Sequence, residues 1–194
     1  MYEIVEILNL KDMLKKTKEM FADNVAYKIK VGEGKYKTVS HLEVRNTIDY
    51  FGTALIRLGL KGKRIAVIGE NRYEWEIAYL SIVCGTGVVV PVDKSLPENE
   101  LKSVIERSEA EAIIFSGKYE EVLTKIKYDE NNKLKHLISM DSLKNKEGVY
   151  SQSKLIEIGR LLVEGGNREF IDADIDAEKM SIMLFTSGTT SSSK

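Results

Sequence analysis

The chain has 194 residues, enough to bury a substantial core as one large domain or two small ones. It is 43% hydrophobic and 30% charged, and its 29 basic and 30 acidic residues leave a formal net charge of −1. This balance is typical of a soluble globular protein and argues against a dedicated nucleic-acid-binding protein, which normally carries a basic excess.

The sequence also bears on the compartment. Its single cysteine, Cys84, excludes an internal disulfide framework and is typical of a reducing environment. Cys84 stands in an apolar run with no histidine nearby in sequence, so we expect a buried thiol rather than a nucleophile. The longest uncharged run, 77–92, is shorter than the roughly 18–20 residues that span a bilayer, and no signal peptide is visible. We expect a cytoplasmic protein without a transmembrane segment.

The first forty residues predict a helix followed by a hairpin. Apolar residues at helical spacing predict a helix over 10–21, and Asn9 with Asp12 resembles its start. Segments 25–30 and 36–39 flank a glycine-containing turn, a pattern typical of a β-hairpin.

A second helix begins next. Ser40 and Glu43 form a capping box, and the residues after them place one apolar face toward a core. Gly59 is a natural stop for this helix. His41 falls in its first turn, where we expect it to be exposed.

From here short apolar strands alternate with helices. Such alternation indicates βαβ units and a largely parallel sheet covered by helices on both faces. The expected strands are 65–68, 88–92, 112–115 and 137–140, and the expected helices are 73–84, 95–108 and 119–126.

The remainder leads to the C-terminus of the sequence. We expect an exposed loop over 127–135, a helix over 155–163 closed by two glycines, and an acidic irregular bridge over 167–179. The bridge feeds an apolar strand over 180–185. The strand is followed directly by a run of hydroxyl side chains.

That run, Phe-Thr-Ser-Gly-Thr-Thr-Ser-Ser-Ser-Lys at 185–194, is the most informative part of the chain. Hydroxyls and backbone N–H groups bond phosphate oxygens, glycine permits close approach, and lysine adds positive charge. It is not a Walker loop, because Ser193 rather than glycine precedes Lys194. A flexible tail is the alternative reading of its composition. Its place after an apolar strand favours a phosphate site, since ligands bind beyond the carboxyl ends of parallel strands.

Several segments, taken in order, resemble one family. The hydroxyl run resembles the phosphate-binding signature of the AMP-forming adenylating enzymes, which include acyl-CoA synthetases, luciferases and peptide-synthetase adenylation domains. Similar segments stand upstream, and together the resemblance covers about residues 38–194. The upstream segments are Glu-Asn-Arg-Tyr-Glu-Trp at 70–75, Ala-Tyr-Leu at 78–80, Gly-Thr-Gly-Val-Val-Val-Pro-Val-Asp at 85–93, Leu-Pro-Glu-Asn-Glu-Leu at 96–101 and Ser-Glu-Ala-Glu-Ala at 108–112.

The resemblance implies roles for the hydroxyl run. Its backbone and hydroxyls would hold the β- and γ-phosphates of ATP, Thr189 would contact Mg²⁺, and Lys194 would add charge near the departing pyrophosphate. The implied reaction joins a small-molecule carboxylate to AMP and then passes the acyl group to a thiol, usually that of coenzyme A. The ATP-binding residues implied are Thr186, Ser187, Gly188, Thr189, Thr190 and Lys194.

The resemblance also implies the organisation of the protein. The expected fold is α/β, a largely parallel sheet of βαβ units flanked by helices, with an N-terminal helix and β-hairpin. Residues 1–194 would be the N-terminal portion of an adenylating domain, cut within the signature at 186–194. The family's adenine pocket, ribose-binding aspartate, metal-binding glutamate and C-terminal domain with its catalytic lysine all follow the signature. No catalytic residue is therefore expected within this chain, and we expect it to be inactive alone.

One departure concerns the loop itself. The family usually has glycine where this chain has Ser191, and often proline where it has Ser193. A side chain at Ser191 disfavours positive φ, which bears on the geometry of the loop and its affinity for nucleotide.

Two smaller motifs are better explained by a structural role than by a binding site. Gly85 and Gly87 follow a helix and lack a third glycine, so a helix stop is favoured over a dinucleotide turn. His41 and His136 lack the spacing of zinc ligands.

Two further motifs leave alternatives open. Trp75 and Tyr79, four apart on one expected helix, favour core packing over lining a substrate cavity. The Glu-Asn-Arg segment at 70–72 ends a strand, where a functional site and a polar turn are equally compatible with the sequence.

The sequence leaves three functions open. The leading hypothesis is part of an ATP-dependent carboxylate–CoA ligase of fatty acid metabolism, because the signature resembles fatty-acyl synthetases more than peptide-synthetase modules. A stand-alone nucleotide- or phosphate-binding module is the second, and a protein-binding α/β scaffold with an inert tail is the third.

Overall fold

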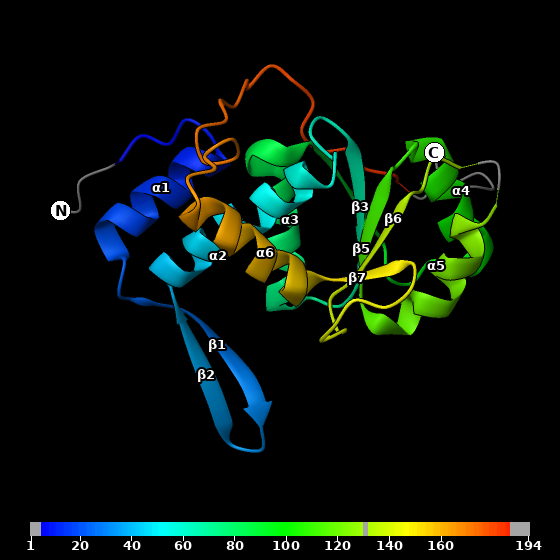
Figure 1. Cartoon of the computed structure of the whole chain (residues 1–194), viewed down its shortest axis with the longest axis horizontal. Helices are drawn as coiled ribbons and strands as arrows, with labels where there is room; N and C mark the ends of the chain where they lie inside the picture. The colour runs from blue at the N-terminus through cyan, green and yellow to red at the C-terminus, as the bar shows by residue number, and fades with distance from the viewer. Residues whose placement is uncertain (1–4, 130–131, 187–194) are drawn as a thin grey trace.

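A computed structural model describes residues 5–129 and 132–186 of the chain. Strands and helices alternate from β3 to β6, after an N-terminal helix, hairpin and long second helix, and β7 follows β6 without a helix between them (Figure 1). The elements are α1 Leu10–Phe21, β1 Val25–Gly32, β2 Lys35–Ser40, α2 His41–Arg57, β3 Arg64–Ile68, α3 Tyr73–Ser81, η1 Ile82–Thr86, β4 Val88–Val92, α4 Glu98–Ser108, β5 Ala112–Phe115, η2 Gly117–Tyr119, α5 Glu120–Lys127, β6 His136–Ser139, β7 Val149–Ser151 and α6 Gln152–Glu164.

Five parallel strands form the main sheet, in the order β4-β3-β5-β6-β7. Strand β3 pairs with β4 on one side and β5 on the other, with Ile65 opposite Val89 and Ala112. The predicted α/β class and the parallel arrangement of these three strands are confirmed.

The sheet separates two cores. Alternate strand residues point to opposite faces, so Ile65 and Val67 enter one core while Ala66 and Ile68 enter the other. Helices α2, α3 and α6 cover the first face, and α4 and α5 cover the second. Burial on both faces explains why these strands are almost continuously apolar.

The N-terminal elements form as predicted. The Asn9 side chain accepts a hydrogen bond from the Asp12 N–H, 2.9 Å, and starts α1. Ser40 and Glu43 form both bonds of the capping box, at 3.2 and 2.7 Å. The hairpin β1–β2 projects away from the rest of the fold (Figure 1). His41 is half-buried rather than exposed, because its ring lies 6.4 Å from that of Phe21.

The helix expected over 73–84 is regular only to Ser81. It continues as the π-helical turn η1, whose end is set by Gly85 at φ 147°. A side chain at this φ would be strained, so the expected role of Gly85 as a helix stop is confirmed. The hydroxyl of Thr86 donates to the carbonyl of Ser81, 2.9 Å, and satisfies a helix-end acceptor.

The helix expected from 95 begins later, at Glu98. Pro97 disfavours helical backbone at Leu96, so the helix cannot start before the proline. Ser95 instead donates its N–H and hydroxyl to the Asp93 carboxylate, at 2.8 and 2.7 Å, in a tight turn after β4.

Two differences concern short strands. The strand expected over 137–140 lies one residue earlier, as β6, and β7 was not expected at all. β7 has only three residues, too few to show a periodicity in the sequence.

Candidate functional site

The segment Met180–Thr186 is the described part of the expected phosphate site. It lies beside β4, because Ile182 forms a parallel bridge with Val89. The N–H of Val89 donates to the carbonyl of Ser181, 3.0 Å, and the N–H of Met183 donates to the carbonyl of Val89, 2.9 Å. The segment thus extends the sheet past β4 and runs in the same direction, although its pairing is one bridge rather than a full strand.

The side chains of this segment alternate. Met183 and Phe185 pack against the core beneath α4 and α5. Met180, Ile182 and Leu184 point the other way and are 52%, 37% and 68% exposed. Period-2 alternation is the signature of strand geometry, so the expected extended conformation is present.

Thr186 is the one predicted ATP-binding residue within the described ranges. It is exposed and is the last residue of the extended segment. Together with Phe185 it lines a pocket of about 260 Å³ whose other walls come from β4, the turn after it and α4. The Phe185 ring is held there by the guanidinium of Arg107, 5.3 Å from its centroid.

The remaining predicted site residues, Ser187, Gly188, Thr189, Thr190 and Lys194, lie outside the described residues. So does Ser191, where the sequence departs from the resembled signature. The described residues therefore locate the start of the hydroxyl run. It lies at the edge of the sheet where parallel strands present their carboxyl ends.

A second polar group gathers at the same edge, at the ends of β3, β5 and β6. Glu70 accepts a hydrogen bond from the Ser116 hydroxyl, 2.6 Å, and an ion pair from the Lys118 ammonium, 2.5 Å. Arg72 bonds the Asp141 carboxylate, 2.5 Å, and that carboxylate also accepts the N–H of Gly117, 2.6 Å. We call Glu70, Arg72, Ser116, Lys118 and Asp141 the strand-end cluster.

The charges of the cluster are paired with one another and with the neighbouring Glu74. Hydrogen bonds from Lys118 and Ser116 lower the pKa of Glu70 to about 2. A hydrogen bond to Glu74 and a further one to Asp141 raise the pKa of Arg72. Because these charges are paired with one another, the polar-turn reading of residues 70–72 is favoured. The sequence motifs did not single out Ser116, Lys118 and Asp141, although the positions of these residues just after expected strands were a usable signal.

The aromatic pair on α3 packs against the core and also lines an open pocket. Trp75 and Tyr79 stack with centroids 5.5 Å apart and pack against the core of the α2 face. They also line an open pocket of about 690 Å³ with the edge-on pair Tyr27 and Tyr73. Packing is confirmed, and a share of each aromatic side chain remains accessible.

Cys84 is buried, as predicted. Its thiol is 1% exposed, and burial raises its pKa to about 12. Such a group is protonated at physiological pH and lacks the thiolate character of a nucleophile.

Among residues 5–129 and 132–186, no group of three or more His, Cys, Asp and Glu side chains is placed to hold a metal ion. Within the same ranges, no helix combines the length and apolar character needed to cross a membrane.

Comparisons with known proteins agree on one family. Residues 14–194 match the family described as AMP-binding enzyme. A CoA ligase of Gibberella moniliformis is 30% identical over 135 residues, covering 70% of this chain and 20% of that protein. Fatty acyl-CoA synthetase A of Dictyostelium discoideum is 28% identical over 170 residues, covering 83% of this chain and 24% of that protein.

The fold has counterparts among solved structures. The anthranilate CoA ligase AuaEII, solved in complex with anthranoyl-AMP, superposes with a TM-score of 0.79 at 19% identity, over 98% of this chain and 34% of that chain. The chain therefore spans about a fifth to a third of the length of these relatives. Since the family match covers nearly all of the sequence, including the hydroxyl run, the chain belongs to the AMP-binding enzyme family.

Proposed function

We propose that this chain is the N-terminal part of the adenylating domain of an ATP-dependent carboxylate–CoA ligase. The observation that carries the proposal is the family match over residues 14–194, which includes the hydroxyl run. The position of Thr186 at the carboxyl end of an extended segment beside β4 supports it, because this is where a parallel sheet binds a phosphate group.

The proposed reaction has two steps. A carboxylate oxygen of the substrate attacks the α-phosphorus of ATP, an acyl-phosphate bond forms, and pyrophosphate leaves. The thiol sulfur of coenzyme A then attacks the acyl carbonyl, loses its proton, and AMP departs. The first step builds negative charge on the departing pyrophosphate, which hydroxyl and N–H donors stabilise.

The proposed phosphate-binding residues are Thr186, Ser187, Gly188, Thr189, Thr190 and Lys194. Hydroxyl and phosphate oxygens are the ligands that Mg²⁺ prefers, and we assign Thr189 to that contact. The bound ion would neutralise charge on the phosphates. Lys194 would add a charge that no other side chain of the run carries.

The substrate we propose is a fatty acid. The support is the Dictyostelium relative named fatty acyl-CoA synthetase A, while the relative solved with anthranoyl-AMP marks an aromatic acid as the alternative. Charge balance and the absence of a spanning helix among the described residues are compatible with a cytoplasmic enzyme that binds no nucleic acid. We also propose that the isolated chain forms no acyl-AMP, because it spans at most about a third of these relatives.

The test is carboxylate-dependent exchange of labelled pyrophosphate into ATP. The full-length enzyme should exchange in the presence of Mg²⁺ and a fatty acid, whereas the 194-residue chain should not. Fatty acids of increasing length and anthranilate are compared as substrates. If the full-length enzyme exchanged pyrophosphate with none of the carboxylates in the panel, the proposal that it is a carboxylate ligase of this kind would be refuted.

A further inference from the structure

A strap crosses the α2 face of the fold before the extended segment begins. We define the strap as residues 167–179, which join the end of α6 to Met180. In Figure 1 it runs in orange to red from α6, past α1, toward the edge of the sheet. Its own regular bonds are few, mainly a turn in which the N–H of Asp172 donates to the carbonyl of Arg168, 2.8 Å. Its position therefore depends on contacts with distant parts of the chain.

The first contact is an aromatic anchor. Phe170 is fully buried, and its ring lies over Gly52 of α2. A methyl group at Gly52 would come within 2.2 Å of the ring, so only glycine leaves room for it. On the other side, a methyl group at Gly85 would lie 3.3 Å from the ring and 3.2 Å from the Ala173 Cβ. The strap is thus seated between α2 and η1.

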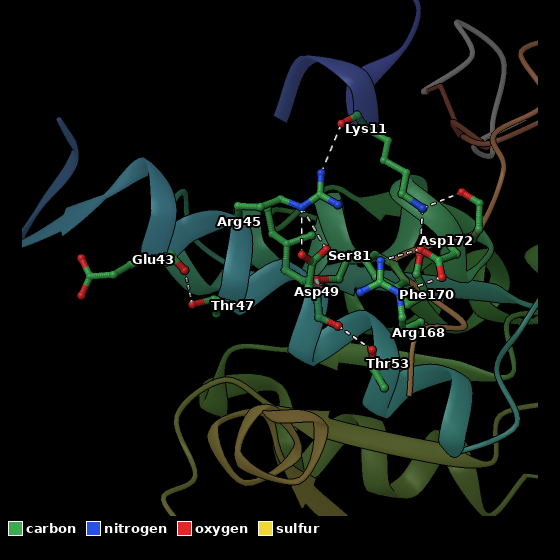
Figure 2. Close-up of polar contacts among 12 residues, drawn as sticks. Lys11, Glu43, Arg45, Thr47, Asp49, Thr53, Ser81, Arg168, Phe170 and Asp172 are labelled. Carbon is green, nitrogen blue, oxygen red and sulfur yellow. Dashed lines mark hydrogen bonds and ion pairs between the residues drawn. The ribbon is translucent and has the colours of Figure 1, made fainter. Parts of the chain in front are cut away.

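The second contact is made by Lys11 of α1. Its ammonium donates to the carbonyl of Phe170, 2.7 Å, and to the carbonyl of Ala173, 2.6 Å (Figure 2). The same ammonium lies 5.3 Å from the centroid of the Phe170 ring. One side chain thus binds both ends of the turn that carries the anchor.

Lys11 is itself held in place from α2. The guanidinium of Arg45 donates to the Lys11 carbonyl, 3.3 Å, and its Nε lies 3.0 Å from both oxygens of Asp49. Figure 2 shows these groups in a row from α1 across α2 to the strap. Burial and the nearby Arg45 lower the pKa of Lys11, and the carboxylates of Asp49 and Asp172 partly oppose this shift. An ammonium kept in this setting marks a specific contact rather than a solvated surface charge.

We infer that Lys11 is a positioning residue that fixes the strap and thereby delivers residues 180–186 to the edge of β4. Beyond the turn, eight positions separate Ala173 from Ser181, whose carbonyl receives the Val89 N–H. Among the described residues, the extended segment itself is held by that bridge and by the packing of Met183 and Phe185. If the strap were released, residues 180–186, which lead into the hydroxyl run, would be free to move away from the sheet.

The inference rests on the proposed function for its catalytic consequence, but not for its structural part. The structural part is tested through the rate at which the thiol of Cys84 is labelled. Cys84 is the only cysteine and directly precedes Gly85, which the strap covers. Opening the strap should expose this thiol to a reagent such as 5,5′-dithiobis(2-nitrobenzoate). Labelling of the 194-residue chain is measured without urea and at several urea concentrations well below the unfolding transition. Local opening is distinguished from global unfolding by its weak dependence on urea.

The variant Lys11→Met should accelerate labelling of Cys84 by about tenfold, since two charge-assisted bonds are lost. Lys11→Arg, which can donate to both carbonyls, should restore much of the protection. Lys15→Met, one turn away on the same helix and in loose contact with Glu19 at 4.0 Å, should label like the parent. The Lys11 charge lowers the pKa of Cys84, so its removal alone would slow labelling. Acceleration would thus report opening and not an electrostatic effect.

The catalytic part is tested by pyrophosphate exchange in the full-length enzyme. Lys11→Met should lower kcat/KM for ATP by about tenfold, mostly through KM, because misplaced phosphate donors weaken binding of the ground state. Lys11→Arg should recover most of it, and Lys15→Met should match the parent. If Lys11→Met does not fold, Phe170→Leu is used in both assays.

Parental rates of labelling in the Lys11→Met chain would overturn the inference. Faster labelling with unchanged kinetics would overturn its catalytic part. An unmodified enzyme that performs no exchange would instead count against the proposed function, while the labelling result would still decide whether Lys11 holds the strap.

Discussion

The sheet and the extended segment beside it are held in opposite ways. Each strand from β3 to β7 has a continuous parallel ladder, and the core strands are buried on both faces. The segment 180–186 has one bridge to β4, one packed face and three exposed apolar side chains. The part of the chain nearest the proposed chemistry is therefore the part with the least local support. Its position depends on long-range anchors, and these can be changed without touching the sheet.

The largest effects are expected at two equally buried phenylalanines, which test the difference in support between sheet and strap. They are Phe115 in β5 and Phe170 in the strap. Phe115→Ala should lower the free energy of unfolding of the whole domain by about 3–5 kcal/mol. Phe170→Ala should lower it by less, because the strap can detach while the sheet remains folded. Urea unfolding gives the first quantity, and hydrogen exchange of residues 176–186 should rise selectively in Phe170→Ala. Equal losses of global stability would show that strap and sheet form one cooperative unit.

A smaller effect is expected at the capping box of α2, the helix on which the anchor sits. Ser40→Ala removes the acceptor for the Glu43 N–H and should cost about 1 kcal/mol of unfolding free energy. Ser40→Asp keeps an acceptor and should restore most of it. The measurement is thermal or urea unfolding of the three proteins. A Ser40→Asp protein as unstable as Ser40→Ala would mean that the cap is not the source of the loss.

The smallest effect is expected at a group of ion pairs around Glu111. This group lies at the amino end of the sheet, opposite the carboxyl end where the proposed site lies. Hydrogen bonds from Lys135 and Lys63, at 2.8 and 2.7 Å, lower the pKa of Glu111 from 4.5 to about 2. A carboxyl whose pKa is lower in the folded state stabilises the fold above its unfolded pKa, and this contribution is lost as the pH falls from about 4.5 toward 2.

Glu111→Gln should therefore reduce unfolding free energy at pH 7 by about 1 kcal/mol or less, since both lysines are exposed and water screens the pairs. The difference from the parent should shrink as the pH falls from 4.5 to 2. Urea unfolding at several pH values measures it, with the exposed Glu33→Gln as the control. A difference that grows in acid would reverse the sign of the pair's contribution.

Much of the fold could be predicted because local patterns agree with tertiary structure. β4 and β5 match their expected bounds since apolar runs there are set off by glycine and polar residues. The later start of α4 follows from Pro97, which disfavours helical backbone at the residue before it and so excludes the expected start at residue 95.

The candidate site was predictable only in part. The strand before the hydroxyl run shows in the sequence as an apolar segment, whereas its neighbour β4 is chosen by the sheet topology. The strap anchor could not be read at all, because Lys11 and Phe170 are 159 positions apart and each has an ordinary surrounding sequence. Such contacts arise only when the helices pack.

The most direct test of the central claim, that the hydroxyl run binds the phosphates of ATP, is pyrophosphate exchange in the full-length enzyme with Thr189→Ala and Lys194→Ala. Each change removes a group proposed to stabilise charge on the leaving pyrophosphate, and each should lower turnover by on the order of 10²–10³. The control is Thr124→Ala on α5, where the hydroxyl donates to the carbonyl of Glu120 one turn earlier in the same helix. Exchange at the parental rate by both variants would contradict the claim and leave residues 186–194 as a linker.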